Sequence, residues 1–428
     1  MASRNQALLK LSRFYLVRLQ MIEAMFNLDK EDRPASLAGL VLESENIRSC
    51  IHHLDQIFET TGDLESARLC MGILESGTET IARFLPFHEQ KEWYETALRM
   101  AKNTGDVNAE YRYTHNLALI SSSIGNISSA IKLQKQSLQL AKKSGDPKNH
   151  AKALNSLGQL YIQADQLELA QKCYDEFFSV NAGSDDLKEL GYAIGNVGLI
   201  HHRLGDWADA DEAYRYVLEV SKKLKDRNSE CKALCRLGEL HFDLRRYPRS
   251  REYFEKALVV AKEEMDISLL DSVYQGLGNI SLMQKRYPDA KAHYERCYKN
   301  AQGDGRLSDQ AIALGNIGNI FFKICQFDRA RRYYERQLET VQSIQNKKQI
   351  ADSCLNIGLT YMNENQKGLA EKYIFRSVAI YEEMNIPYPL HLQLAQRRVG
   401  VPDPWLFSLA LNLRFKICRF VNRKYQEI

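Results

Sequence analysis

Apolar positions recur along most of this chain with the period of an α-helix. In residues 151–190 the apolar or small positions form two successive stretches: Ala151, Leu154, Leu157, Gly158 and Tyr161, then Ala170, Cys173, Tyr174, Phe177 and Phe178. Spacings of three and four residues place each stretch on one face of a helix. The same pattern recurs every forty residues, so each unit is predicted to hold two amphipathic helices, here termed helix A and helix B.

Small residues mark the register of the repeat. One slot in helix A is small in seven consecutive units: Ala118, Gly158, Gly198, Gly238, Gly278, Gly318 and Gly358. A second small residue follows twelve positions later, and an aromatic stands four further on in five units: Tyr174, Tyr214, Phe254, Tyr294 and Tyr334. We expect helix A to cross helix B closely at the small residues, with the aromatic filling the space beside them. A fixed period of this size is the signature of a solenoid.

Turn residues separate the predicted helices. Gly125-Asn126 and Gly205-Asp206 follow helix A in two units, and Ala164-Asp165-Gln166 takes their place in the unit between. Glycine or asparagine there accepts the left-handed conformation that ends a helix. Aspartates recur before helix A at forty-residue intervals: Asp106, Asp146, Asp186, Asp226 and Asp266. Each is expected to cap the helix that follows.

Two segments carry a family resemblance. Leu157-Gly158-Gln159-Leu160-Tyr161 and Ala170-Gln171-Lys172-Cys173-Tyr174 resemble the tetratricopeptide repeat pattern, and the match extends over about residues 107–382. The usual helix A tryptophan and late proline are absent, and the period exceeds the usual 34 residues. The resemblance implies an all-α right-handed superhelix, an α-solenoid of seven regular repeats over 107–386 with irregular helical caps.

Residues 1–106 are predicted to form an irregular helical cap. Leu8–Met25 and Leu37–Phe58 are expected to be two helices, and Leu64–Phe84 with Glu89–Lys102 a degenerate pair. The segments 42–48 and 93–98 resemble the region that joins tetratricopeptide arrays to the ATPase core of STAND-type signalling ATPases. That resemblance implies an alternative role for the chain, as the ligand- or protein-sensing arm of such a system.

The tail over residues 387–428 breaks the period. Four prolines interrupt it, and Trp405–Lys424 is then apolar on one side and basic on the other. The segment is predicted to be a helix that caps the last repeat, because the end of a solenoid needs a polar cover. Dimerisation and contact with a membrane surface are the alternatives.

Composition narrows the classes of function. Basic and acidic residues number 58 and 54, are interspersed, and leave a net charge of +4, whereas nucleic-acid binders concentrate basic residues on one face. The sequence contains no run of eighteen apolar residues and therefore predicts no membrane span. The nine cysteines lack paired metal-binding spacing and are interpreted as reduced thiols, which favours a cytoplasmic location.

The chain carries no recognisable catalytic motif. Phosphate-loop, nucleophile-elbow and H-E-x-x-H patterns are all missing. His201 occupies an aromatic slot of helix A that Tyr161, His241 and Phe321 hold elsewhere, so it is interpreted as a satisfied core histidine. Tyrosines repeating on helix B are assigned to packing rather than to stacking on RNA bases: Tyr253, Tyr333 and Tyr373. We expect no enzyme activity, no cofactor and no metal ligand.

The resemblance places ligand-facing positions on helix A, which lines the concave groove of tetratricopeptide arrays. These positions precede the glycine slot by six, three and two or follow it by one and four. They include His202 and the candidate peptide-binding residues Lys152, Asn155, Gln159, Asn196, Lys232, Arg236, Asn279, Asn316, Asn319 and Asn356. Many are asparagines, whose amides offer a donor and an acceptor to an extended peptide backbone.

Three of these residues resemble part of the carboxylate clamp of cochaperone tetratricopeptide domains. Asn196, Lys232 and Arg236 match three of its five positions, while Asn155 and Gln159 replace the other two. The resemblance implies binding of an acidic or C-terminal peptide. The alternative is a solvated helix face on which Glu239 and Asp243 neutralise the two cations. The sequence therefore predicts a non-catalytic scaffold for a protein or peptide partner.

Overall fold

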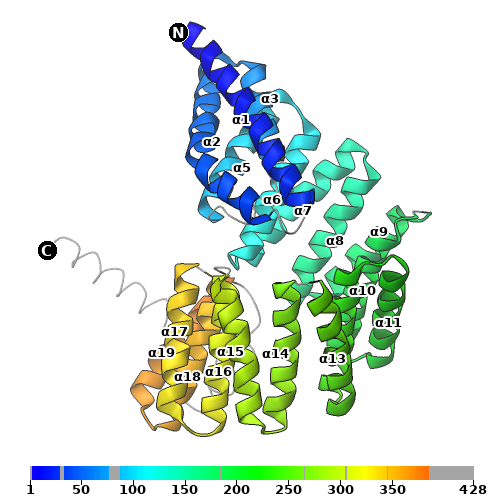
Figure 1. Ribbon diagram of the computed structural model, residues 1–428, viewed down its shortest axis with the longest axis vertical. Coiled ribbons are helices and arrows are strands. Elements are labelled where there is room, and N and C mark those ends of the chain that lie inside the picture. Colours follow the sequence, from blue (N-terminus) through cyan, green and yellow to red (C-terminus); the bar gives the residue numbers. More distant parts are fainter. Residues whose placement is uncertain are drawn as a thin grey trace, which may run out of the picture. The chain divides into compact units, whose positions relative to one another are not determined.

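The computed structural model describes residues 2–28, 33–76, 87–183, 185–264, 266–303, 306–344 and 346–384, where all regular secondary structure is helical (Figure 1). The helices are α1 (Ala2–Leu28), α2 (Arg33–Thr61), α3 (Leu64–Ser76), α5 (Phe87–Thr104), α6 (Val107–Ser123), α7 (Ile127–Ser144), α8 (Pro147–Gln163), α9 (Leu167–Val180), α10 (Leu187–Leu204), α11 (Trp207–Lys223), α12 (Arg227–Asp243), α13 (Tyr247–Glu263), α14 (Ile267–Met283), α15 (Tyr287–Gly303), α16 (Leu307–Lys323), α17 (Phe327–Ser343), α18 (Lys347–Asn363) and α19 (Lys367–Met384). The predicted all-α fold is confirmed.

The chain forms two compact units, Met1–Asp226 and Arg227–Ile428, which we describe separately. Unit 1 holds the irregular helices α1, α2, α3 and α5 and then three helix pairs, α6/α7, α8/α9 and α10/α11. Unit 2 holds four pairs, from α12/α13 to α18/α19. The predicted boundaries at 106 and 386 remain predictions, and the tail helix Trp405–Lys424 lies outside the described residues.

Helix A and helix B meet at the predicted small residues. A β-carbon added at Gly198 would lie 2.9 Å from both the Ala213 β-carbon and the Tyr214 ring, and one at Gly278 would lie 2.6 Å from Tyr294. The second small residue is fully buried in every pair: Ala130, Ala170, Ala210, Ser250, Ala290, Ala330 and Ala370. The predicted crossing is thus confirmed, and its closeness depends on the absence of a side chain.

Every turn from helix A to helix B contains one left-handed residue. Seven residues share this conformation at forty-residue intervals, with φ between 56° and 90°: Gly125, Asp165, Gly205, Arg245, Lys285, Cys325 and Asn365. In the α14/α15 turn, Lys285 donates its backbone N–H to Leu282 at 3.0 Å and Arg286 donates to Ser281 at 2.8 Å. These two bonds close the helix end, so the turn is retained where glycine is not available.

Aspartates cap helix A as predicted in four repeats. The Asp106, Asp146, Asp186 and Asp266 carboxylates each accept a backbone N–H from the first turn of the following helix. Asp266, for example, accepts from Ser268 at 2.9 Å and from Leu269 at 3.2 Å. These bonds satisfy amide donors that no helical carbonyl can reach.

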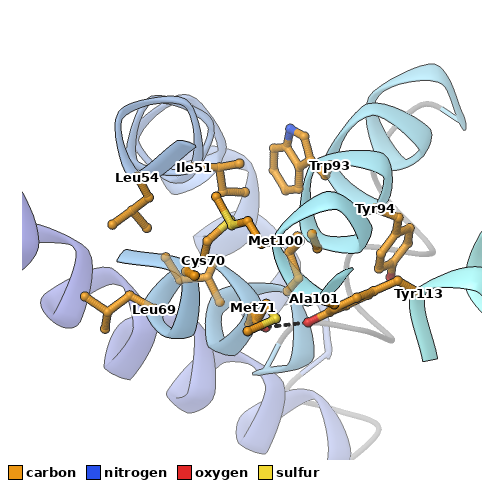
Figure 2. Close-up of a cluster of buried hydrophobic side chains, with 14 of the residues drawn as sticks. Ile51, Leu54, Leu69, Cys70, Met71, Trp93, Tyr94, Met100, Ala101 and Tyr113 are labelled. Carbon is orange, nitrogen blue, oxygen red and sulfur yellow. Dashed lines mark hydrogen bonds between the residues drawn. The ribbon is translucent and has the colours of Figure 1, made fainter. Parts of the chain in front are cut away.

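The irregular helices of unit 1 enclose a core rich in sulfur and aromatic rings. Cys70 and Met71 from α3 lie against Met100 from α5 and Ile51 from α2 (Figure 2). The Tyr113 hydroxyl of α6 donates to the Met71 carbonyl at 3.2 Å, shown dashed in Figure 2. This core therefore joins the irregular helices to the first regular repeat. Across the described ranges, no helix is both long enough and apolar enough to cross a membrane.

Candidate binding face on helix A

In unit 1 two of the candidate asparagines are brought together. The Asn196 side-chain amide of α10 donates to the Asn155 side-chain carbonyl of α8 at 3.1 Å. The Tyr174 hydroxyl from α9 lies 3.3 Å from the same oxygen. Lys152 and Gln159 are exposed on α8. The two asparagines therefore tie neighbouring repeats together, while the lysine and glutamine face solvent.

In unit 2 two further asparagines accept hydrogen bonds from tyrosine hydroxyls. Tyr294 donates to the Asn279 side-chain oxygen at 2.6 Å, and Tyr334 donates to that of Asn319 at 2.7 Å. Burial raises the pKa of both tyrosines, so they remain donors. Each amide is thereby fixed with its oxygen toward helix B, and its NH2 group has no protein partner among the described residues.

Helix A supplies a hydrogen-bond acceptor where the aromatic residue on helix B is a tyrosine. Tyr174, Tyr294 and Tyr334 each find an asparagine oxygen, and the Tyr214 hydroxyl lies 3.4 Å from the His202 Nδ1 atom. Phe254 has no hydroxyl. The residue one after the glycine in its repeat is the exposed Glu239. The asparagines at this face thus hold helix A and helix B together through these hydrogen bonds, in addition to any binding of a ligand.

Part of the clamp-like group is engaged in an ion pair. Arg236 on α12 binds Glu239 one turn on, at 2.9 Å, and both side chains are nearly half exposed. Lys232 is exposed on the same helix. Such a surface pair contributes roughly 0–1 kcal/mol, so a ligand carboxylate could displace it at little cost. Asn196 belongs to unit 1 and the two cations to unit 2, so the complete clamp remains a prediction.

The two adjacent histidines exchange their expected roles. His201, interpreted from the sequence as a core residue, keeps 30% of its side chain exposed, with its Nδ1 atom 3.5 Å from Asp206 and 3.9 Å from Asp209. His202, expected to face a ligand, is buried against Trp207 and Tyr214. The interpretation was wrong because Trp207, at the start of α11, covers the His202 side of the helix.

His201, Asp206 and Asp209 form a group of potential metal ligands within the described ranges. The two carboxylates lie at the N-cap and in the first turn of α11, where the helix dipole favours negative charge without any cation. The group therefore gives no independent indication of a metal.

Repeated tyrosines on helix B pack within the fold, as predicted. Tyr253 stacks on His241 with ring centroids 5.3 Å apart, and Tyr333 stacks on Phe321 at the same distance. Tyr373 stacks on Tyr361 at 5.7 Å. These faces are occupied by protein rings, which supports packing over RNA recognition.

A cavity in unit 1 was missed by the sequence analysis. It has a volume of about 320 Å³ and lies between α2 and α5, lined by Glu45, Arg48, Ser49, Ile51, His52, Asp55, Glu92, Trp93 and Thr96. Its residues come from two segments some forty positions apart, and no recognised motif joins them. These residues line one open space because α2 and α5 are partly separated there.

Paired helices in a fixed forty-residue register define this molecule as a helical repeat protein of the α-solenoid class. Models of the tetratricopeptide repeat match residues 189–263 and 229–303, 151–183 and 351–383, and 313–348. The chain belongs to the tetratricopeptide repeat family. No sequence among curated proteins matches it significantly.

Solved structures resemble this chain at low sequence identity. A Rap protein complexed with competence and sporulation factor is 12% identical over 87% of this chain and 98% of its own, with a TM-score of 0.56. The apo form of the quorum sensor NprR from B. thuringiensis is 16% identical over 71% and 84%, with a TM-score of 0.52. A STAND signal transduction ATPase with a tetratricopeptide repeat sensor, from Pyrococcus horikoshii, is 16% identical over 88% and 55%, with a TM-score of 0.45.

Proposed function

We propose that this protein is a non-catalytic interaction scaffold whose helix A face in unit 2 binds an extended segment of a partner protein. The observation that carries the proposal is the pair of fixed amides at Asn279 and Asn319. They occupy the same slot of consecutive repeats, and neither NH2 group has a partner in the part of the chain that the structure describes. Fixed donors in register suit the carbonyl groups of an extended backbone.

The surroundings of the two amides support this use. Asn279 is exposed and Asn319 is half-buried, so a ligand has access to both. Asn316 and Asn356 add two half-buried amides two positions before the glycine slot on α16 and α18. An ion pair between Asp271 of α14 and Arg306, just before α16, links the two repeats at 2.6 Å. The spacing of the donors is thereby held before a ligand arrives.

The charge at one end of this face suggests the chemistry of the partner. Lys232 and Arg236 present two cations on one face of α12, where the Glu239 carboxylate is paired to Arg236. An acidic side chain or a C-terminal carboxylate would find charge-assisted hydrogen bonds there. We therefore propose a partner segment that is acidic at the end meeting α12.

The test begins with affinity purification from the native source, followed by binding of short overlapping peptides from each recovered protein. The double variant Asn279→Ala/Asn319→Ala should bind the cognate peptide more weakly, because two donors are lost. The double variant Lys232→Glu/Arg236→Glu should bind it more weakly still. Lys299→Glu with Arg332→Glu, at exposed helix B positions, is the matched control. Equal affinity in all four proteins would refute the proposed face. Recovery of an ATPase whose binding survives both groove variants would favour the sensing-arm alternative.

A further inference from the structure

The cavity between α2 and α5 has walls that are tied at both ends. Arg48 of α2 binds Glu89 of α5 at 2.5 Å, and Arg99 of α5 binds the Asp55 carboxylate of α2 through two bonds of 2.7 Å. From the first ion pair to the second, the residue numbers increase on both helices, so α2 and α5 run parallel. The cavity thus lies between two ion pairs that hold its width.

The floor of the cavity is apolar but ends in an unused donor. Trp93 and Ile51 line it and are about 5% and 4% exposed. The indole nitrogen of Trp93 points away from the buried cluster in Figure 2. Its N–H has no hydrogen-bond partner among the described residues, and the nitrogen is accessible to solvent. An aliphatic stem could lie on this apolar floor.

The rim of the cavity has an excess of negative charge. Its lining includes three carboxylates, from Glu45, Asp55 and Glu92, and one guanidinium, from Arg48. Arg48 is shared between Glu45 and Glu89, and Asp55 is bound by Arg99. Glu92 forms no ion pair within the described part of the chain. A ligand entering the cavity therefore meets one uncompensated carboxylate beside an aromatic ring.

We propose that this cavity binds an alkylguanidinium or alkylammonium group. The cation would pair with Glu92 and lie near the face of Trp93, while its methylene stem covers Trp93 and Ile51. The volume of about 320 Å³ is that of a small ligand site and accommodates such a group. Ser49, His52 and Thr96 add polar atoms for the rest of the ligand. Two sources share this chemistry, a free amine and an arginine or lysine side chain of a partner protein.

The test uses the full chain and the emission of Trp93 as the readout. The sequence has three tryptophans, so Trp207→Phe with Trp405→Phe leaves Trp93 as the single reporter. Agmatine represents the free amine, and acetyl-Gly-Arg-Gly-amide represents the side chain. Saturable changes with either probe, but none with butyrate or butanol, are expected. Tighter binding of agmatine would assign the site to a free amine, and tighter binding of the peptide to a partner side chain.

Variants separate recognition from folding. Glu92→Gln should weaken the better probe about tenfold, because one charge-assisted bond is lost. Trp93→Phe keeps a ring but weakens the cation–π attraction, and calorimetry should show weaker binding there too. Glu95→Gln, three residues along α5 and outside the cavity lining, should bind as the parent does. Absence of saturation, equal binding of butyrate, or unchanged affinity in Glu92→Gln with native helicity would overturn the proposal.

Discussion

A single missing β-carbon sets how closely helix A approaches helix B. Two of the three glycines in α10 show the difference. A β-carbon at Gly198 would meet Ala213 and Tyr214 at 2.9 Å, whereas one at Gly195 would meet Val217 at an ordinary 3.6 Å. The sequence alone shows that the first glycine repeats every forty residues and the second does not. In α10 repetition thus separates the glycine required by packing from the one that merely weakens its helix, although the non-repeating Gly276 is also closely packed, against Phe254, by the same measure.

This contrast predicts opposite effects of the same substitution. Gly198→Ala should lower the free energy of unfolding by about 1–3 kcal/mol, because Tyr214 must move. Gly195→Ala should raise it by about 1 kcal/mol, because alanine favours the helix and has room. Urea denaturation of both variants beside the parent measures the change. Stabilisation by both would show that the crossing tolerates a side chain.

A buried histidine gives the first repeat a sensitivity to acid. His115 lies close to the Gln134 side-chain oxygen at 3.1 Å, and Gln134 in turn donates to the Ala153 carbonyl. Burial, with Lys152 nearby, lowers the pKa of His115 to about 4. In the unfolded chain an ordinary histidine titrates near 6.5. Between these values only the unfolded state takes up the proton.

We therefore predict a loss of stability as pH falls from about 6.5 to about 4. One such group accounts for about 3 kcal/mol over this interval, present in full above pH 6.5. His115→Phe should be less stable than the parent at pH 7, because Gln134 loses a partner. The difference should shrink or reverse at pH 4. Denaturation midpoints across this range measure it, and a gap that is constant with pH would contradict the assignment.

Asparagines on helix A show where sequence reasoning stops. Their place on a ligand-binding face remains a prediction, and Asn279 is exposed there. Their hydrogen bonds to tyrosine hydroxyls were not predicted, because donor and acceptor lie on different helices. The helical period gives the face of a residue but not the length or rotamer of the side chain opposite.

At the scale of elements, helix termini are set more by backbone geometry than by residue type. The sequence predicted left-handed turns from glycine and asparagine. The structure places Arg245, Lys285 and Cys325 in the same conformation. Nothing about arginine, lysine or cysteine favours it, so only their place in the forty-residue register carried the signal. The helices on both sides, packed through their small residues, impose the turn.

Such turns should be improved by glycine. Lys285→Gly should raise the free energy of unfolding by up to about 1 kcal/mol, because the left-handed conformation strains a residue with a β-carbon. Lys299→Gly within α15 should lower it by about 1 kcal/mol. Thermal and urea unfolding of the two variants compares a turn with a helix interior. A loss in both would mean that Lys285 forms contacts worth more than its strain.

At the scale of the molecule, the repeat length predicted the fold class, and the family match agrees with it. The division after Asp226 and the cavity between α2 and α5 were not predicted. The cavity depends on how well α2 and α5 fit together, which small differences in side-chain volume decide. A period identifies the repeated helix pair but does not reveal where two helices leave a space between them.

The central claim is that fixed amides on helix A of unit 2 hold a partner backbone. Tyr294→Phe with Tyr334→Phe leaves both asparagines in place but removes the hydroxyls that orient them. Tyr298→Phe, whose hydroxyl accepts from Arg336 on the helix B side, is the matched control. The decisive measurement is the affinity of the cognate peptide for the three proteins by calorimetry. We predict binding about fivefold weaker in the double variant, since preorganisation is lost, and unchanged in the control. Equal affinity in all three would contradict the claim.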